Sequence, residues 1–439
     1  MRGFAAHPAM RVSGSMAVPG DKSISHRALM LSGIAEGVSE VNGFLASEDC
    51  LASLAAMRAL GVRIERPSED RVVIHGVGMR GLQGAGGPLD MGNAGTAMRL
   101  FTGLLSAQQF DSQLIGDASL MQRPMERVAK PLREMGADVR TRNGTPPVDI
   151  GGSRSLHGID YRMPIASAQV KSAILLAALY ASEPTTITAP AASRDHSERM
   201  LKSCGVKLIS DGLRITVHPP QRLSSQNITV PGDFSSAAFF IVAGLLAAPP
   251  QGLLIQNVGL NPTRTGLLEI LRRMGGQIEI LNARECGAEP VADLRISASR
   301  LHGVRVSKSL VSLAIDELPV LFIAAACAQG ETWVSGAEEL RVKESDRIAA
   351  MSAGLTALGV AHTALPDGMR IEGRELGSAF TSGEIDSFGD HRIAMAFAIA
   401  SLRAAGAIEI RDVANVATSF PGFVPLAQSV GLAILESIA

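Results

Sequence analysis

The stretch RMGGQIEI at residues 273–280 decides the fold, because a helix-like segment ends there at Gly275 and a strand-like segment follows at once. The same pattern returns five times, as ALGVRI (59–64), EMGADVR (134–140), SCGVKL (203–208), ALGVAH (357–362) and SVGLAIL (429–435). The six glycines lie roughly 70 to 85 residues apart. A recurring period indicates one supersecondary unit used several times, although this period is longer than that of the common solenoids. Each glycine is expected to end its helix in a left-handed conformation.

Two kinds of helix are predicted in every copy. One kind is apolar almost all round and must therefore be buried, at 25–35, 96–107, 169–181, 235–248, 317–328 and 392–404. The other kind is amphipathic and leads into the recurring glycine, at 50–60, 124–135, 196–204, 262–274, 345–358 and 421–430. Three amphipathic segments open with proline, at Pro124, Pro262 and Pro421, which we expect at the first helical position.

Strand patterns fill the gaps, for example TTITA (185–189) and AIEIRDV (407–413), so the unit is predicted to be β-α-β-α-β-β and to occur six times. A second repeat lies over the first, since VPGDKSISHRA (18–28) is echoed by VPGDFSSAAFF (230–240). The sequence thus predicts an α/β protein with two domains of three units each. Residues 21–231 form the first domain, and residues 1–20 with 232–439 form the second. A cleft between two such domains is a favoured place for a ligand.

Composition excludes several classes of protein. Apolar residues make up 46% of the chain and the net charge is −1, which argues against disorder and against a nucleic-acid binder with a broad basic face. The four cysteines form no CxxC pair and lie in or beside apolar runs, as buried thiols do in a reducing compartment. The N-terminus has no secretory pattern, and the longest apolar runs are too short to span a membrane. We expect a soluble cytoplasmic protein without a metal site.

Basic and hydroxyl residues stand where several buried helices begin. GDKSISHR (20–27) places Lys22, Ser23 and Arg27 at such a start, which is a favourable anion site, although Lys22 and Arg27 could instead be surface cations at a domain edge. GNAGTAMR (92–99) contains Gly95, where a ligand could approach the backbone closely or where the chain makes a plain packing turn. Arg123 precedes a predicted helix, as do the segments ASAQVK (166–171) and SRDH (193–196).

The densest charged stretch is RVKESDR at 341–347. If it is helical, Lys343 and Arg347 share one face, with Glu344 turned about 100° away. The plain alternative is a solvated helix face, in which Asp346 pairs with a neighbouring arginine. GDHR (389–392) opens the next buried helix, and Asp316 opens the fifth one, either as an N-cap or as a general base beside cations.

Seven cations thus stand at helix starts: Lys22, Arg27, Arg123, Arg194, Lys343, Arg347 and Arg392. Helix N-termini carry partial positive charge, so these groups need counter-charge. We interpret the pattern as a site for two polyanionic substrates that supply it.

In order, the motifs DKSISHR, GNAGTAMR, GDASLMQRP, ASAQVKS, SRDHSER, RVKESDR and GDHRIAMAF resemble those of the EPSP synthase (3-phosphoshikimate 1-carboxyvinyltransferase) family, from about residue 12 to the end. The resemblance implies a two-domain inside-out α/β fold with the active site in the interdomain cleft. It implies transfer of the enolpyruvyl group of phosphoenolpyruvate to shikimate 3-phosphate, with release of phosphate and without cofactor, metal or nucleic acid, in a monomer.

The resemblance also assigns roles to residues. The residues that would contact shikimate 3-phosphate are Lys22, Ser23, Arg27, Ser167, Ala168, Gln169, Arg194, Asp316 and Lys343. Contacts with phosphoenolpyruvate fall to Lys22, Gly95, Gln169, Arg123, Arg347 and Arg392, and Lys343 would touch both substrates. Asp316 would take the proton of the 5-hydroxyl and Glu344 would protonate the methylene carbon, with Lys22 as a third catalytic candidate.

Three positions depart from many members of the family, which have Ser at Ala168, Asn at Glu339 and Lys at Thr418. Gly95 keeps the small residue that leaves room for glyphosate in this family. The related UDP-N-acetylglucosamine enolpyruvyl transferases use a cysteine as acid, and GDASLMQRP has none. RNA 3′-phosphate cyclases share the architecture, but no nucleotide-binding pattern is visible. A non-catalytic anion sensor is the remaining alternative, and the presence of Asp316 and Glu344 favours an enzyme.

Overall fold

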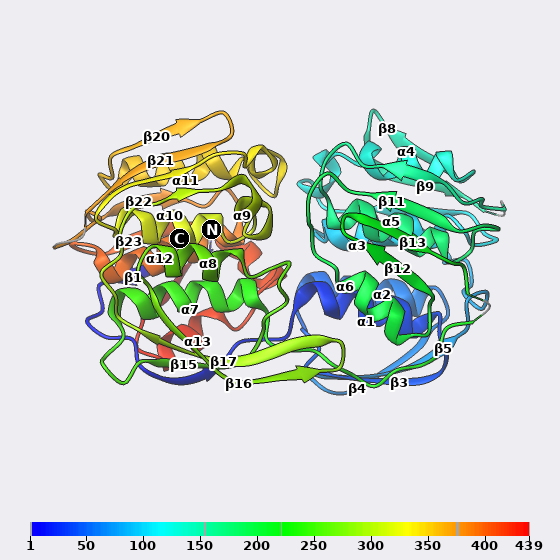
Figure 1. The fold of residues 1–439 in the computed structure, drawn as a ribbon, viewed down its shortest axis with the longest axis horizontal. Helices are drawn as coiled ribbons and strands as arrows, with labels where there is room; N and C mark the ends of the chain where they lie inside the picture. The colour runs from blue at the N-terminus through cyan, green and yellow to red at the C-terminus, as the bar shows by residue number, and fades with distance from the viewer. Residues whose placement is uncertain (1, 153–154, 221, 375–376, 439) are drawn as a thin grey trace. The chain divides into compact units, whose positions relative to one another are not determined.

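The structure is a computed structural model that describes residues 2–152, 155–220, 222–374 and 377–438. The chain divides into two compact units. Unit 1 comprises residues 1–19, 231–285 and 289–439, and unit 2 comprises residues 20–230 and 286–288. Each unit contains three four-stranded sheets (Figure 1).

The sheets of unit 2 share one topology, in which the first two strands are parallel and the later pairs are antiparallel. In sheet order the strands are β14 (Ile228–Thr229), β3 (Glu36–Asn42), β5 (Arg71–Val77) and β4 (Arg63–Ser68); β6 (Leu89–Asp90), β7 (Ser112–Ile115), β9 (Thr145–Gly151) and β8 (Asp138–Arg142); and β10 (Asp160–Arg162), β11 (Thr185–Thr188), β13 (Arg214–Val217) and β12 (Leu208–Asp211).

The sheets of unit 1 repeat this topology, and two of them are completed by the N-terminal strands β1 and β2. Their strands are β2 (Gly14–Ala17), β15 (Leu253–Gly259), β17 (Glu289–Ser297) and β16 (Gln277–Cys286); β18 (Arg305–Val306), β19 (Gly330–Val334), β21 (Gly368–Gly373) and β20 (His362–Leu365); and β22 (Gly383–Asp386), β23 (Ile408–Arg411), β1 (Arg2–His7) and β24 (Ala433–Ile438).

The apolar helices lie inside the units, as predicted. They are α1 (Lys22–Gly33), α3 (Gly95–Leu105) and α5 (Ala168–Ala178) in unit 2, and α7 (Phe234–Ala247), α10 (Leu318–Ala326) and α12 (His391–Ala400) in unit 1. Every residue of α10 and α12 is buried. Figure 1 shows these helices in the middle of each unit with strands toward the outside, which is the inside-out arrangement.

The amphipathic helices are α2 (Glu48–Ala59), α4 (Glu126–Glu134), α6 (His196–Ser203), α8 (Gly266–Arg273), α11 (Arg347–Ala357) and α13 (Phe423–Ser429). A short helix, α9 (Lys308–Leu313), precedes α10. All six recurring glycines have positive φ, between 72° and 104°. After each of them the next N–H donates to the carbonyl five residues back, as Gly276 does to Leu271 at 2.8 Å, which is the Schellman bond of a glycine C-cap.

The recurring stretch also braces its own helix against the following strand. In four copies, the side chain three residues before the glycine donates to the carbonyl three residues after it. These pairs are Arg58 to Ile64, Arg133 to Val139, Arg272 to Ile278 and Gln428 to Ile434. The bond fixes the direction in which the strand leaves the helix.

The three prolines do not occupy first helical positions, so that prediction was wrong. α4 begins two residues after Pro124, α8 four residues after Pro262 and α13 two residues after Pro421. Proline holds the residue before it in extended backbone, and Arg123 accordingly has φ −79° and ψ 143°. The prolines belong to the turns that lead into the helices.

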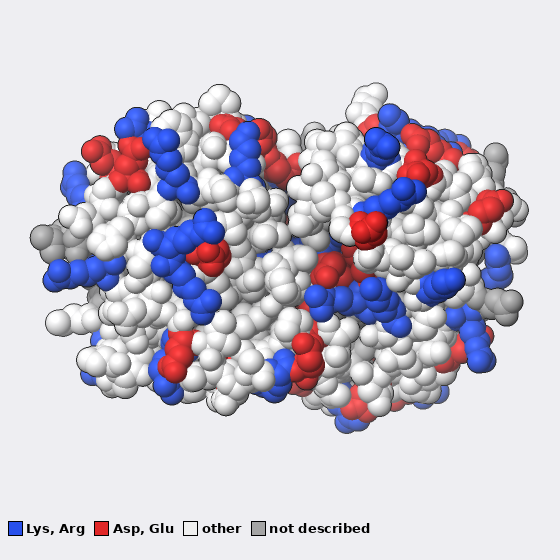
Figure 2. Space-filling view, in the orientation of Figure 1, with Lys and Arg blue, Asp and Glu red and all other residues white. Residues whose placement is uncertain are grey.

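Acidic and basic side chains are interspersed on each unit over the face that Figure 2 shows. All four cysteines are free thiols. Within the described residues, no helix has both the length and the apolar character needed to cross a membrane.

Candidate functional site

The predicted residues of unit 2 lie at or near the starts of its helices, and we call them the unit 2 cluster (Lys22, Ser23, Arg27, Gly95, Arg123, Ser167, Ala168, Gln169 and Arg194). Gln169 joins the starts of α5 and α3. Its Nε2 donates to Thr96 Oγ1 at 2.8 Å, and its Oε1 accepts from Arg99 Nη1 at 2.6 Å. Arg99 is buried and thereby fixes the orientation of the Gln169 amide. The sequence analysis did not assign this role, although Arg99 ends the GNAGTAMR motif.

Arg27 joins α1 to α5 and α6. Its Nε donates to Ser197 Oγ and its Nη2 donates to Ser172 Oγ, both at 2.7 Å, while Nη1 donates to the Ser23 carbonyl at 2.9 Å. Ser197 Oγ in turn donates to Ser172 Oγ at 2.7 Å. Only 4% of Arg27 is exposed, so it is not a surface cation at a domain edge. Ser172 and Ser197 are neighbours of Arg27 that the sequence analysis missed.

Lys22 begins α1 and pairs with a carboxylate of its own unit. Lys22 Nζ lies 2.9 Å from Asp49 Oδ2, with the two side chains 17% and 8% exposed. Between Lys22 and Arg27 lies the fully buried His26, whose Nδ1 is 2.7 Å from Ser53 Oγ. Burial, and then the charges of Lys22 and Arg27, lower the pKa of His26 well below its usual value, so the ring is neutral.

Arg123 and Gly95 lie next to each other. Arg123 Nη2 donates to Asn93 Oδ1 at 2.5 Å and Nη1 donates to the Asn93 carbonyl at 3.3 Å. A Cβ on Gly95 would lie 3.0 Å from Arg123 Nη1 and 3.2 Å from Arg99 Nη1. Two guanidinium groups thus approach Gly95 closely, and a Cβ there would require them to shift by a few tenths of an ångström.

Ser167 is the N-cap of α5, where its side chain accepts from the Val170 N–H, and Ala168 is the first residue of that helix. Arg194 lies two residues before the start of α6 and is partly exposed. The unit 2 cluster thus collects hydroxyls, an amide and cations at helix N-termini, which is a favourable environment for an anion.

The predicted residues of unit 1 form a second group, the unit 1 cluster (Asp316, Lys343, Glu344, Arg347 and Arg392). The expectation that Lys343 and Arg347 share a helix face was wrong. A 3-10 helix, η2 (Glu338–Val342), ends before Lys343, and α11 begins only at Arg347. Asp346 caps α11 by accepting from Ala349 N, and it accepts from Arg341 Nη1 at 2.7 Å, as the partner of a neighbouring arginine was expected to do. The cap at Asp346 separates η2 from α11. The chain between these two helices brings Lys343 and Glu344 toward the carboxylates and the buried guanidinium of the cluster.

Arg347 is the centre of this cluster, with 1% of its side chain exposed. Its Nε donates to Asp390 Oδ2 at 2.8 Å, its Nη2 to Glu344 Oε2 at 2.6 Å and its Nη1 to Asp316 Oδ1 at 3.4 Å. Burial lowers the pKa of Arg347, but the charges of Asp390, Glu344 and Asp316 more than offset this and raise the pKa above its usual value. Lys343 Nζ lies 3.3 Å from Asp316 Oδ1.

Asp316 is not an N-cap, because Glu317 occupies the cap position of α10 and makes no side-chain cap bond. Arg392 Nη1 donates to the Asp316 carbonyl at 3.0 Å and lies 3.9 Å from Glu317 Oε1. Glu317 also accepts a short bond from Ser235, and Ser235 Oγ accepts from Arg264 Nη2 at 2.6 Å. The starts of α7, α10 and α12 are thus connected.

The view that the substrates supply all the counter-charge was wrong. Carboxylates of the chain lie within 3.4 Å of Lys22, Lys343 and Arg347. Except for Glu344, which is three positions from Arg347, these carboxylates come from residues 27 to 43 positions away, which a local pattern does not reveal. Among the described residues, no group of three or more His, Cys, Asp or Glu side chains is arranged to hold a metal ion.

The positions that depart from the family pattern differ in their surroundings. Glu339 lies in η2 and is partly exposed. Thr418 is buried at the end of the 3-10 helix η4 (Ala414–Thr418), where its hydroxyl donates to the Asn415 carbonyl at 2.7 Å. The Thr418 hydroxyl is therefore engaged within its own turn.

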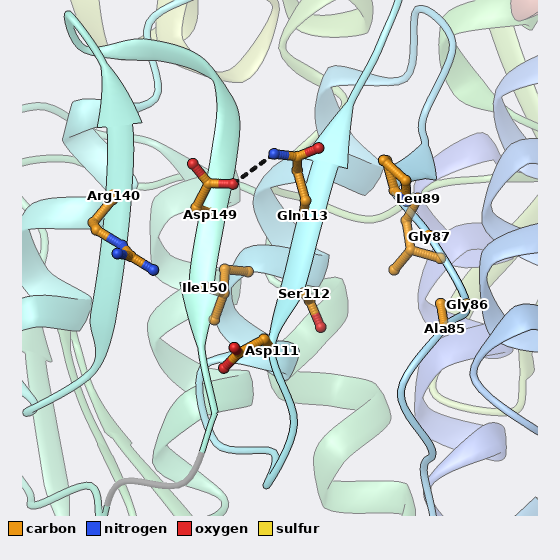
Figure 3. A pocket seen from close by; sticks show the side chains of 11 residues that line it. Ala85, Gly86, Gly87, Leu89, Asp111, Ser112, Gln113, Arg140, Asp149 and Ile150 are labelled. Atoms are coloured by element: carbon orange, nitrogen blue, oxygen red, sulfur yellow. Dashed lines mark hydrogen bonds between the residues drawn. The ribbon is translucent and has the colours of Figure 1, made fainter.

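Two cavities of unit 2 can be compared with the predicted site. One, of about 600 Å³, is lined by α4, by residues 160–165 and by Ser167 and Val170. The other, of about 450 Å³, lies at β6, β7, β8 and β9 (Figure 3) and holds none of the predicted site residues. Gln113 Nε2 donates there to Asp149 Oδ1 at 2.7 Å, a bond that joins β7 to β9. Only the first cavity adjoins the unit 2 cluster.

Comparison with known proteins identifies the family. A model of the family "EPSP synthase (3-phosphoshikimate 1-carboxyvinyltransferase)" matches residues 6–426. The chain is 58% identical to the 3-phosphoshikimate 1-carboxyvinyltransferase of Methylococcus capsulatus, covering 98% of both chains, and 54% identical to that of Alkalilimnicola ehrlichii, covering 99% of this chain and 97% of the relative.

Solved structures agree with this assignment. EPSP synthase from Acinetobacter baumannii superimposes with a TM-score of 0.89 at 50% identity, covering 100% of each chain. The enolpyruvyl transferase NikO of Streptomyces tendae is 16% identical with a TM-score of 0.79, over 100% of this chain and 99% of NikO, and shares the fold. With a match over nearly its whole length and more than half of its residues identical to these relatives, the chain belongs to the EPSP synthase family.

Proposed function

We propose that the chain transfers the 1-carboxyvinyl group of phosphoenolpyruvate to the 5-hydroxyl of shikimate 3-phosphate and releases phosphate. The observation that carries the proposal is the unit 1 cluster, in which two carboxylates, Asp316 and Glu344, contact the same buried Arg347. Two carboxylates held beside fixed cations are suited to acid–base chemistry on a phosphorylated substrate. Membership of the family supplies the identity of the substrates.

On this proposal the unit 2 cluster binds shikimate 3-phosphate. Its hydroxyls and cations stand at helix N-termini, where an anion is stabilised by backbone N–H groups and by side chains together. Ser23, Arg27, Ser167, Ala168 and Arg194 hold the phosphate and the carboxylate of shikimate 3-phosphate. Gln169, whose amide is fixed by Arg99 and Thr96, lies between the two substrates.

Phosphoenolpyruvate is bound by Gly95, Arg123, Arg347 and Arg392, and Lys22 and Lys343 contact both substrates. On this proposal both clusters act on one pair of substrates. Closure around the ligands excludes water and strengthens the attraction between the fixed cations and the two phosphates.

The reaction proceeds by addition and elimination through a tetrahedral intermediate. Asp316 accepts the proton of the 5-hydroxyl as its oxygen attacks C2, and Lys343 Nζ lies 3.3 Å from the Asp316 carboxylate. Glu344 gives a proton to the methylene carbon and later removes one as phosphate leaves. Arg347 contacts both carboxylates, so it stabilises the charge that moves between them.

The test measures phosphate release from phosphoenolpyruvate with shikimate 3-phosphate, with UDP-N-acetylglucosamine or with no acceptor. We expect release only with shikimate 3-phosphate. Asp316→Ala and Glu344→Gln should keep substrate binding, measured by calorimetry, and lose turnover. Binding of both substrates without turnover in the unaltered protein would favour the anion sensor, and release with the nucleotide sugar would favour the related transferase.

We also infer three accompanying properties. Glyphosate should inhibit the enzyme, because Gly95 keeps the small residue that leaves room for glyphosate in this family, and an inhibition curve that stays flat up to millimolar glyphosate would contradict this. The protein should act as a monomer, since every residue of the proposed site comes from one chain. Light scattering measures the molar mass in solution and tests this. The four free thiols suit a reducing compartment such as the cytoplasm.

A further inference from the structure

A buried ion pair that the proposed mechanism does not use lies between α5 and α6. Lys171 Nζ is 2.6 Å from Glu198 Oε1, and the two side chains are 4% and 8% exposed. Lys171 Nζ also donates to the Ser193 carbonyl at 3.3 Å. Burying two charges costs desolvation energy that their attraction often fails to recover, so a buried pair is weak evidence for a role in stability. The position of the Lys171–Glu198 pair next to residues of the unit 2 cluster indicates another role.

The neighbours of this pair hold the cations of the cluster. Ser172 and Ser197, each adjacent in the chain to one member of the pair, accept the two hydrogen bonds from Arg27. Ser193, whose carbonyl Lys171 contacts, immediately precedes Arg194. A small shift of α6 against α5 would therefore move the groups that orient both arginines.

The pair also reaches the N-cap of α5. The Lys171 N–H donates to the Ser167 carbonyl at 3.0 Å, so Lys171 lies one turn after the cap. On the other side, Glu198 lies in the first turn of α6. Among the described residues, Glu198 Oε2 accepts no hydrogen bond, so the carboxylate is anchored through Oε1 and its attraction for Lys171.

We propose that Lys171 and Glu198 are positioning residues for shikimate 3-phosphate. The ion pair fixes the start of α6 against α5, and thereby the geometry in which Arg27 and Arg194 meet the substrate. The inference rests on the proposed function, because it names what the pair positions. If the inference is correct, loss of the ion pair does more than lower stability. It weakens the binding of shikimate 3-phosphate and leaves the binding of phosphoenolpyruvate nearly unchanged.

A paired replacement separates positioning from stability. Lys171→Met with Glu198→Leu replaces the ion pair by apolar side chains of similar size, an exchange that is often neutral or stabilising. It removes the bond to the Ser193 carbonyl and the charge attraction between the helices. Glu198→Gln alone keeps an acceptor at Oε1 but removes the charge. Glu40→Gln, in the exposed pair with Arg71 on the β3–β5 sheet, is the control.

The experiment determines KM for each substrate, kcat, the affinity for shikimate 3-phosphate alone by calorimetry, and the melting temperature. For the double variant we expect a melting temperature within about 2 °C of the unaltered protein. Its KM and Kd for shikimate 3-phosphate should rise on the order of tenfold, while kcat and the KM for phosphoenolpyruvate change less than about threefold. Glu198→Gln should shift the same two constants, and Glu40→Gln none.

Unchanged constants for shikimate 3-phosphate in a folded variant would overturn the inference, as would equal rises in both KM values. If the double variant does not fold, Glu198→Gln decides by the same constants. Failure of the proposed function has a different signature, since the unaltered protein would then release no phosphate with shikimate 3-phosphate as acceptor. If the unaltered protein also did not bind shikimate 3-phosphate, the inference would be overturned as well.

Discussion

His26 gives the sharpest test of the electrostatics inferred for the unit 2 cluster. The ring is fully buried, its Nδ1 lies 2.7 Å from Ser53 Oγ, and its Nε2 makes no hydrogen bond to any described residue. Burial and the charges of Lys22 and Arg27 lower its pKa well below 6.5. The pH dependence of stability in the unaltered protein, compared with that in His26→Asn, isolates the contribution of this one histidine.

The sign follows from proton uptake. Below pH 6.5 the unfolded chain binds a proton at His26 that the folded chain does not, so the stability contributed by the neutral ring is present above pH 6.5 and is lost as the pH falls. The loss approaches about 1.4 kcal/mol for each pH unit until the folded pKa is reached. Between pH 7.5 and 5.5, the unaltered protein should lose about 1.4 kcal/mol relative to His26→Asn.

The measurement is native-state hydrogen exchange of peptides covering α1, which reports the free energy of opening around His26. Comparison between variants cancels the titration of all other groups. His157→Asn, which removes an exposed histidine, should behave as the unaltered protein does. A difference between the unaltered protein and His26→Asn that stays constant from pH 7.5 to 5.5 would refute the reasoning, because the ring would then titrate equally in both states.

Three other outcomes are expected. Gly95→Ala should raise the KM for phosphoenolpyruvate by roughly tenfold, because its Cβ would lie 3.0 Å from Arg123 Nη1, and steady-state kinetics measure this. Arg347→Lys should cost about 3 kcal/mol in urea unfolding and most of the turnover, because lysine cannot match the planar donors that three carboxylates accept. Gly275→Ala should destabilise more than Gly205→Ala, although both have φ near +90°, since only the former places a Cβ 3.1 Å from a backbone carbonyl; equal melting temperatures would contradict this.

Features that depend on near neighbours could be predicted from the sequence. The six glycines mark helix ends because the Schellman bonds involve residues within five positions of one another. The apolar helices are buried because they have no polar face to expose, as α10 illustrates. The first strand of each repeat was harder to predict, since β14, β6, β18 and β22 contain only two to four residues.

Features that depend on distant partners could not be predicted. Arg27 was identified as a site residue, but its acceptors Ser172 and Ser197 lie 145 and 170 positions away and resemble any other serines in the sequence. The stretch around Arg347 was read as a helix because the cap at Asp346 was not recognised, although Asp is a favoured N-cap residue. The local backbone around Arg347 was therefore predicted incorrectly, and the catalytic roles of these residues stay a prediction.

The echo between residues 18–28 and 230–240 shows what duplication keeps and what it changes. Asp21 and Asp233 both cap the buried helix that follows, so the turn retains its backbone role. In unit 2 the cation begins the helix, as Lys22, and its carboxylate partner comes from α2. In unit 1 the carboxylate is Asp233 itself, 3.1 Å from Arg264, which precedes α8, and phenylalanine stands at the position equivalent to Lys22. The capped turn is thus kept in both units, whereas the cation beside it belongs to the buried helix in unit 2 and comes from Arg264, outside that helix, in unit 1.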